Sequence, residues 1–224
     1  GANQNGEVPI LPFIDAIAYA REKGLKVIAH TGLITRETAR ALKQVGVSQV
    51  LLDIIGDQDT INRVYHLQKK PEDYLEAMLN CREAGIPFAP HIVIGLHYGQ
   101  IKGEMKALDM IKKAEPDILV LVVLTPMPGT MMASISPPSI NKTEVIIARA
   151  REENPQIPVN LGCARPPGEY KKRLERIAVA NRLNAIAYPD VETITYAREQ
   201  GLDIEFVEAC CSLVTEKYPG RGVY

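Results

Sequence analysis

Two residues that can take part in acid–base chemistry follow short apolar runs. His30 follows the apolar residues 27–29, and Asp53 follows the apolar residues 50–52. A carboxylate that is buried without a partner costs several kcal/mol, so we expect Asp53 to face an accessible strand end and to accept hydrogen bonds there. The structural alternative is a carboxylate that a helix N-terminus or a lysine satisfies.

Residues 91–99 form a β-branched run that contains two histidines and two glycines. His91 and His97 stand too far apart in an extended chain to form one metal pair, so we expect each to act as a hydrogen-bonding histidine. Gly95 allows a backbone to approach a flat ligand closely. The side chains of Val93 and Ile94 either pack on such a ligand or fill the interior of the barrel.

A rigid loop follows the apolar run 117–124. Two prolines fix φ in this loop and one glycine permits a tight turn. Such a loop presents backbone amides and carbonyls at little entropic cost, which suits ligand binding, and a purely structural turn is the alternative. Its residues are Thr125, Pro126, Met127, Pro128, Gly129 and Thr130.

Four cysteines are too few and too unevenly spaced for the disulfide framework of a small secreted domain, so reduced thiols or metal ligands are expected. Cys81 lies in an amphipathic helical stretch and is expected in the core. Cys163 and Arg165 are alternate residues at a strand end, so their side chains share a direction toward a carboxylate or a cluster. The alternatives are a Cys163 buried as a small apolar residue and an Arg165–Glu169 ion pair.

Glu208, Cys210 and Cys211 close the last predicted strand, 203–210. Neighbouring residues of a strand point to opposite faces, so at most one of the two thiols is expected in the core. Vicinal cysteines are uncommon as packing residues, and metal, sulfide or redox chemistry is the functional interpretation.

Short apolar runs alternate along the chain with amphipathic helical stretches. Apolar strands separated by helices of similar length indicate a parallel sheet that helices cover. The predicted strands are 26–32, 49–55, 88–95, 117–124, 159–163, 185–188 and 203–210, and the predicted helices are 10–23, 36–45, 72–83, 102–114, 142–153, 168–181 and 191–200.

We therefore predict an α/β fold of the (β/α) TIM-barrel type, with a doubly wound open sheet as the alternative. No glycine-rich dinucleotide turn follows a strand, and the candidate residues gather at C-terminal strand ends, as they do in barrels. The chain begins with a helix that no strand precedes, so we expect the barrel to be incomplete at its N-terminus. Residues 1–224 are interpreted as one domain, with a C-terminal extension from about residue 200.

Charge and hydropathy narrow the class of partner. The chain has 26 Lys and Arg against 27 Asp and Glu, and this balance provides no field that attracts nucleic acid or an anionic membrane. No apolar run reaches the length of a membrane span, and no signal peptide opens the chain. We expect a cytoplasmic protein that acts on a small-molecule or protein-bound substrate.

In their order along the chain, these strand ends resemble the radical S-adenosylmethionine (SAM) enzymes, most closely the biotin synthase and lipoyl synthase group. Asp53 resembles the carboxylate near the SAM ribose, and the residues from Ile92 through Ile94 to Gly95 resemble the motif that packs on adenine, with His91 where a glycine is usual. Gly1 resembles the last glycine of the turn that receives the methionine amino group, and Thr125–Thr130 resembles the Pro-x-Pro-Gly-Thr loop. Arg165 resembles the arginine at the auxiliary cluster of biotin synthase, and residues 184–187 resemble the eighth strand.

This resemblance implies SAM and a 4Fe–4S cluster as cofactors, and hydrogen abstraction from an unactivated carbon by a 5′-deoxyadenosyl radical. The CxxxCxxC segment that binds this cluster is absent from the chain, and we expect it in a segment upstream of Gly1. Sulfur insertion is the expected reaction. The candidates for a substrate or auxiliary iron–sulfur cluster site are His30, His91, His97, Cys163, Arg165, Glu208, Cys210 and Cys211.

Two other functions remain open. An ordinary (β/α) barrel aldolase or isomerase requires a lysine or paired carboxylates at strand ends, and Asp53 has no carboxylate partner on a neighbouring strand end. A cluster-free module would bind SAM, a substrate or a partner chain without catalysis. The expected partners are a small-molecule or carrier-protein-bound acyl substrate and a second chain or homodimer, with neither nucleic acid nor membrane.

Overall fold

The computed structural model describes residues 2–213. Gly1, the expected contact of the methionine amino group, lies outside the described residues, as do residues 214–224. Of the helices in the described part, none is both long enough and apolar enough to span a bilayer.

Six parallel strands form one sheet in which the spatial order of the strands equals their order in the chain. A doubly wound sheet reverses its strand order at a switch point, whereas here each strand pairs with the next one along the chain. The predicted (β/α) barrel type is therefore confirmed, as an open arc whose edges within residues 2–213 are the first and last strands. The strands are β1 (Ile28–His30), β2 (Gln49–Asp53), β3 (Phe88–Ile94), β4 (Leu119–Val123), β5 (Val159–Leu161) and β6 (Ala185–Ile186).

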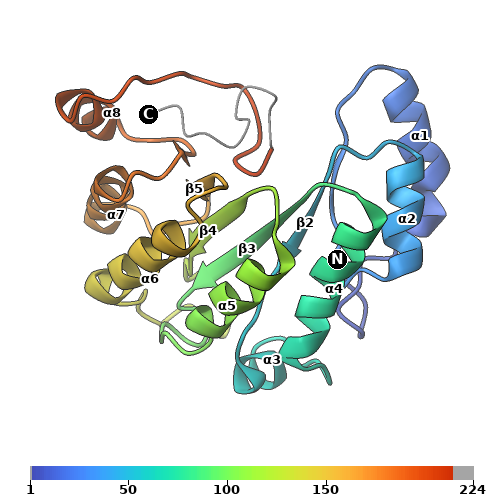
Figure 1. Ribbon diagram of the computed structural model, residues 1–224. Coiled ribbons are helices and arrows are strands. Elements are labelled where there is room, and N and C mark those ends of the chain that lie inside the picture. Colours follow the sequence, from blue (N-terminus) through green and yellow to red (C-terminus); the bar gives the residue numbers. More distant parts are fainter. Residues whose placement is uncertain (1, 214–224) are drawn as a thin grey trace.

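Helices connect consecutive strands, and α4, α5 and α6 lie across one face of the sheet (Figure 1). In the same view, α1 and α8 lie at opposite sides of the molecule. The helices are η1 (Leu11–Phe13), α1 (Ile14–Glu22), α2 (Arg36–Gln44), α3 (Gln58–Arg63), α4 (Pro71–Ala84), α5 (Glu104–Ala114), α6 (Ile140–Glu153), α7 (Glu169–Ala180) and α8 (Val191–Glu199).

Local sequence signals set several helix ends. The Thr35 side chain accepts a hydrogen bond from the backbone N–H of Thr38 at 3.2 Å and so caps α2, as its sequence position predicts. Gly85 ends α4 in the left-handed conformation, with φ of 64°, which glycine adopts without a steric penalty. The short helix α3 was not predicted, although Asp57 is a typical N-cap residue.

The two faces of the sheet differ in what covers them. Val50 and Leu52 belong to the main core, which packs between the sheet and the helices. The alternate residue Leu51 belongs to a separate small cluster with Ala89 and Ile118 on the inner side. This alternation places every second side chain at the strand ends on the inner side as well.

The predicted final strand is wrong, because residues 203–210 form no strand. Phe206 and Val207 are 68% and 45% exposed, so this apolar run has no layer against which to pack. Glu208, Cys210 and Cys211 therefore lie on an irregular segment rather than at a strand end, and this segment turns back from α8 toward the sheet (Figure 1).

A buried ion pair holds the last part of the fold together. Arg165 and Glu175 are 2.7 Å apart, and their side chains are only 2% and 0% exposed. Arg165 also donates hydrogen bonds to the carbonyl oxygens of Gly162 at 2.6 Å and Tyr188 at 3.0 Å, and Glu175 accepts one from the Thr193 hydroxyl at 2.6 Å. The pair connects the end of β5, α7 and the start of α8.

The alternative Arg165–Glu169 pair is wrong, because Glu169 is a solvent-facing residue of the first turn of α7 whose side chain is 86% exposed. Burial by itself would raise the pKa of Glu175, but hydrogen bonds from Thr193 and Asp190 and the Arg165 guanidinium outweigh it, so the pKa lies below its usual range. The pair therefore stabilises the fold above the ordinary carboxyl pKa, and this stability is lost as the pH falls through the folded-state pKa.

Removal of the cation should be strongly destabilising. We expect Arg165→Met to lower the free energy of unfolding by about 3–5 kcal/mol, because the Glu175 carboxylate would lose its buried partner and keep only the more exposed Lys171 ammonium, 3.2 Å away. Urea unfolding at neutral pH measures the change. Arg36→Met is the control, since it removes an exposed pair with Glu83 that should contribute less than about 1 kcal/mol. Equal losses in the two variants would contradict this account.

Candidate functional site

His30 and Asp53, the last residues of β1 and β2, meet on the inner side of the sheet. Nε2 of His30 lies 3.5 Å from Oδ1 of Asp53, and the two side chains are 52% and 35% exposed. The hydrogen bond to Asp53 raises the pKa of His30, against the opposing effect of burial. Asp53 thus lies at an accessible strand end, as expected, and its partner is a histidine rather than a lysine or a helix N-terminus.

His91 lies next to this pair and has the opposite electrostatic character. Its ring stacks on that of His30, with centroids 5.7 Å apart, and the strand register pairs it with Asp53. Its Nδ1 lies 3.0 Å from the Ala89 carbonyl oxygen, which can only accept, so Nδ1 carries the proton. Burial lowers the pKa of His91. A histidine whose pKa is raised by Asp53 therefore stacks on one whose pKa is lowered by burial.

Two tyrosines lie near the Asp53 carboxylate. Burial, and after it the charge of Asp53, raises the pKa of both Tyr65 and Tyr74. Tyr74 is 4% exposed, and its hydroxyl has no hydrogen-bond partner among residues 2–213. This hydroxyl is a donor that a ligand or a water molecule can satisfy. Sequence reasoning missed both tyrosines, since no motif marks them.

The residues expected to contact adenine lie on two sides of β3. Ile92 and Ile94 are 1% and 0% exposed and pack in the core between sheet and helices. Val93 is half-buried and alternates with them, on the same side of β3 as His91. The absent side chain of Gly95 makes room for Pro138, since a Cβ there would lie 2.6 Å from a proline ring carbon. Val93 is thus the strand side chain available to a ligand on the inner side.

The expected ligand loop after β4 is largely exposed and is held by its own hydroxyls. Thr125 donates to the Val123 carbonyl oxygen at 3.1 Å, and Thr130 donates to the Met127 carbonyl oxygen at 2.8 Å. Gly129 adopts φ of 80°, as the tight turn requires. The outer residues of the loop, Met127, Pro128, Gly129 and Thr130, are exposed, while Thr125 and Pro126 are half-buried.

The cysteines divide into one core residue and one group. Cys81 is fully buried, as expected, and burial raises its pKa to about 12. The segment that carries Cys210 and Cys211 is anchored on β5, where the Asn160 amide donates to the Cys211 carbonyl oxygen at 2.8 Å, and Cys163 is near enough to Cys211 to influence its pKa. Glu208 is exposed. Arg165 is committed to Glu175 and to backbone carbonyls, so its guanidinium is not directed toward these thiols as the resemblance implied.

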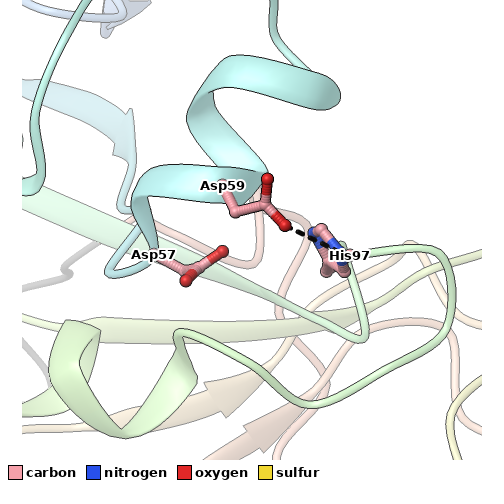
Figure 2. Close-up of side chains that lie close together, drawn as sticks. All are labelled: Asp57, Asp59 and His97. Atoms are coloured by element: carbon pink, nitrogen blue, oxygen red, sulfur yellow. Dashed lines mark ion pairs between the residues drawn. The ribbon is translucent and has the colours of Figure 1, made fainter.

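Another polar group lies at the start of α3 and in the loop after β3 (Figure 2). The ligand atoms of Asp57, Asp59 and His97 lie within 4.8 Å of one another. Each has a protein partner, however: Asp57 accepts from the Thr60 N–H at 2.7 Å, His97 Nδ1 lies 3.0 Å from the Thr60 hydroxyl, and Asp59 binds the Lys102 ammonium. The lysine occupies the place of a cation, so we interpret this group as a helix cap with an ion-pair network.

Comparison with known protein sequences yields a partial match. No family model matches the sequence. The Fe-coproporphyrin III synthase of Methanosarcina barkeri is 38% identical over 71 residues, which are 31% of this chain and 18% of that synthase.

Solved structures share the fold over most of the chain. Methylornithine synthase (PylB) has a TM-score of 0.63 at 13% identity, over 87% of this chain and 64% of its own. HydG, a maturase of the FeFe-hydrogenase, has a TM-score of 0.62 at 20% identity, over 80% of this chain and 42% of its own. A domain of a pyruvate-formate lyase-activating enzyme from Bacteroides vulgatus has a TM-score of 0.52 at 17% identity, over 67% of this chain and 89% of its own.

The matched region thus covers 64% of methylornithine synthase and 18% of the Fe-coproporphyrin III synthase, which is less than two thirds of each. These structural likenesses, all at 20% identity or less, show the fold, and none of the comparisons singles out the biotin synthase and lipoyl synthase group. The cysteines do not fit a CxxxCxxC cluster segment, because Cys81 is enclosed in the core and the other three lie at the end of β5. We therefore derive no step through that cluster.

The stacked histidines should titrate at different pH values. In a histidine ring-proton NMR titration, we expect the pKa of His30 to lie above that of His91. Asp53→Asn should lower the pKa of His30, because it removes the negative charge that favours the imidazolium. Asp59→Asn serves as the control and should leave His30 unchanged. An unaltered His30 pKa in Asp53→Asn would refute the pairing.

Proposed function

We propose that this domain is the SAM-binding core of a radical SAM enzyme, and more narrowly of a sulfur-inserting enzyme similar to lipoyl and biotin synthases. The observation that carries the proposal is the group of His30, Asp53 and His91 at the C-terminal strand ends of a (β/α) sheet. In barrels of this type, substrates and cofactors bind at that end. The similarity of the fold to methylornithine synthase and the partial sequence match to Fe-coproporphyrin III synthase also support the proposal.

Each side chain of this group has a task that its chemistry suits. The Asp53 carboxylate is an acceptor, so it can receive both hydroxyl hydrogens of a ribose. His30 orients that carboxylate, since its Nε2 lies 3.5 Å from Asp53 Oδ1. Val93 offers an apolar surface on the same side, and the unpartnered Tyr74 hydroxyl offers a donor near Asp53.

In the proposed enzyme, SAM and a reduced 4Fe–4S cluster would together supply the chemistry of hydrogen abstraction from an unactivated carbon, and no step of it is assigned to the residues of this chain. The described residues would orient the nucleoside part of SAM and exclude water from the inner side of the sheet. The cysteines of this chain do not have the CxxxCxxC spacing that binds such a cluster. No residue described here is therefore assigned as a ligand of the cluster.

The proposed substrate is a small molecule or an acyl group on a carrier protein. The formal net charge of −1 gives the domain no general attraction for nucleic acid. We place the enzyme in the cytoplasm, where free cysteines remain reduced. A second chain, identical or different, is the proposed protein partner.

SAM binding to the full chain tests the proposal. Isothermal titration calorimetry should show binding that weakens about tenfold in Asp53→Asn, since a hydrogen bond to a charged group contributes about 1.5–3 kcal/mol. Asp59→Asn is the matched control and should bind SAM like the original chain. Equal affinity in both variants, or no binding, would contradict a nucleoside site at Asp53.

Catalysis is tested separately. After anaerobic reconstitution with iron and sulfide and addition of a reductant, formation of 5′-deoxyadenosine from SAM would support the enzyme. SAM binding with no 5′-deoxyadenosine would instead favour the cluster-free binding module for this chain.

A further inference from the structure

The inner side of the sheet is accessible at β2 and covered at β4 and β5. The strand register aligns Asp53, His91, Val120 and Asn160 in one row across β2 to β5. The Asp53 side chain is 35% exposed, whereas Val120 and Asn160 are 0% and 6% exposed. The candidate site at Asp53 is therefore open to a ligand, while the other half of the same row is closed.

The segment that returns from α8 toward the sheet lies at this covered half (Figure 1). Asn160 alternates along β5 with two core residues, so its side chain lies on the inner side. Its amide nitrogen donates to the Cys211 carbonyl oxygen at 2.8 Å, and the next residue, Ser212, is fully buried. We call residues 203–213 the strap and residues 211–213 its tip.

The strap is packed very differently along its length. Residues 205–210 are all exposed, whereas the tip is buried or half-buried. Phe206 and Val207 pack against no layer, and residues 203–213 form no strand, so no ladder of strand hydrogen bonds holds them. Segments with few buried apolar contacts open at a lower free energy than the core of a domain. We therefore expect the strap to open while the sheet stays folded.

The docked tip also leaves buried polar groups poorly satisfied. Asn160 Oδ1 is buried and has no hydrogen-bond partner within residues 2–213. The Ser212 hydroxyl lies 3.1 Å from Cys210 Sγ, and sulfur is a weak hydrogen-bonding partner. Water or a ligand can donate to Asn160 Oδ1 once the tip leaves. The docked state therefore gives up part of the free energy that the hydrogen bond between Asn160 and Cys211 supplies.

We propose that the strap is a lid over the β4 and β5 half of the inner side, and that Asn160 is its latch. When the tip leaves, the Asn160 carboxamide and the side chains of Val120 and Val122 face an accessible space in the row that contains Asp53. A substrate bound next to the nucleoside part of SAM would occupy this space, and closure would then exclude water from it. This placement of the substrate rests on the proposed function, whereas the lid and its latch do not.

An engineered thiol tests whether the strap opens in the folded chain. Val122 is 8% exposed and alternates with core residues, while its neighbour Val123 is buried in the core on the helix side. We expect iodoacetamide to alkylate Val122→Cys at a rate that low urea does not change, because local opening exposes it. Val123→Cys is the matched control and should react only through global unfolding, at a rate that rises with urea. Peptide mass spectrometry distinguishes the new thiol from the four native cysteines.

A second substitution tests the latch. In the Val122→Cys chain, Asn160→Asp should speed alkylation by at least about fivefold, because a carboxylate cannot donate to the Cys211 carbonyl oxygen and is buried unpaired while the tip is docked. Asn154→Asp is the matched control, since Asn154 is also 6% exposed and donates to a backbone carbonyl oxygen, that of Ala150, at 2.9 Å. It should leave the alkylation rate unchanged. Circular dichroism verifies that each variant is folded.

Addition of SAM separates the lid from the proposed nucleoside site. Saturating SAM should leave the alkylation rate of Val122→Cys unchanged, because Asp53 lies outside the covered half. The proposal is overturned if Val122→Cys reacts only through global unfolding, if Asn160→Asp does not alter its rate, or if SAM blocks the reaction. Absence of SAM binding would instead contradict the proposed function and leave the evidence for the lid intact, since alkylation without SAM requires no ligand.

Discussion

The alternation of side chains along parallel, sequentially paired strands is the constraint on which the candidate site depends. Because each strand pairs with the next one in register, alternate residues face either the helices or the inner side of the sheet. His30, Asp53 and His91 fall on the inner side at adjacent strand ends. Ile92 and Ile94 fall on the helix side and become core residues. A shift of one residue in β3 would exchange these roles.

Desolvation then decides the chemical character of the inner group. The pKa of His30, which is half exposed, is raised by its hydrogen bond to Asp53, whereas burial lowers the pKa of His91. The Asp57, Asp59 and His97 group contains similar residue types but is satisfied internally, with Thr60 and Lys102 as partners (Figure 2). Residue type alone therefore does not distinguish a binding site from a structural network; the partners do.

The buried Arg165–Glu175 pair fixes the backbone on which Cys163 lies. It fixes the backbone directly after β5, where Cys163 lies, and joins it to α7 and to the start of α8. Its position also explains why the Arg165 guanidinium is not directed toward the Cys163 thiol, although the two residues are close in the sequence. The guanidinium faces a carboxylate inside the fold, while the Cys163 side chain is exposed.

The sequence by itself determined the fold class and most helices and strands, because apolar periodicity, Thr35 and Gly85 act locally. It also indicated Asp53 at a strand end and Cys81 in the core. The exposed segment 203–210 was misassigned, since apolar content predicts a strand only where a neighbouring layer exists. Only the tertiary structure decided which carboxylate pairs with Arg165, placed Tyr74 near Asp53, and anchored the segment that carries Cys210 and Cys211 on β5 through Asn160. Those contacts join residues distant in the chain, and they follow from packing that no local pattern encodes.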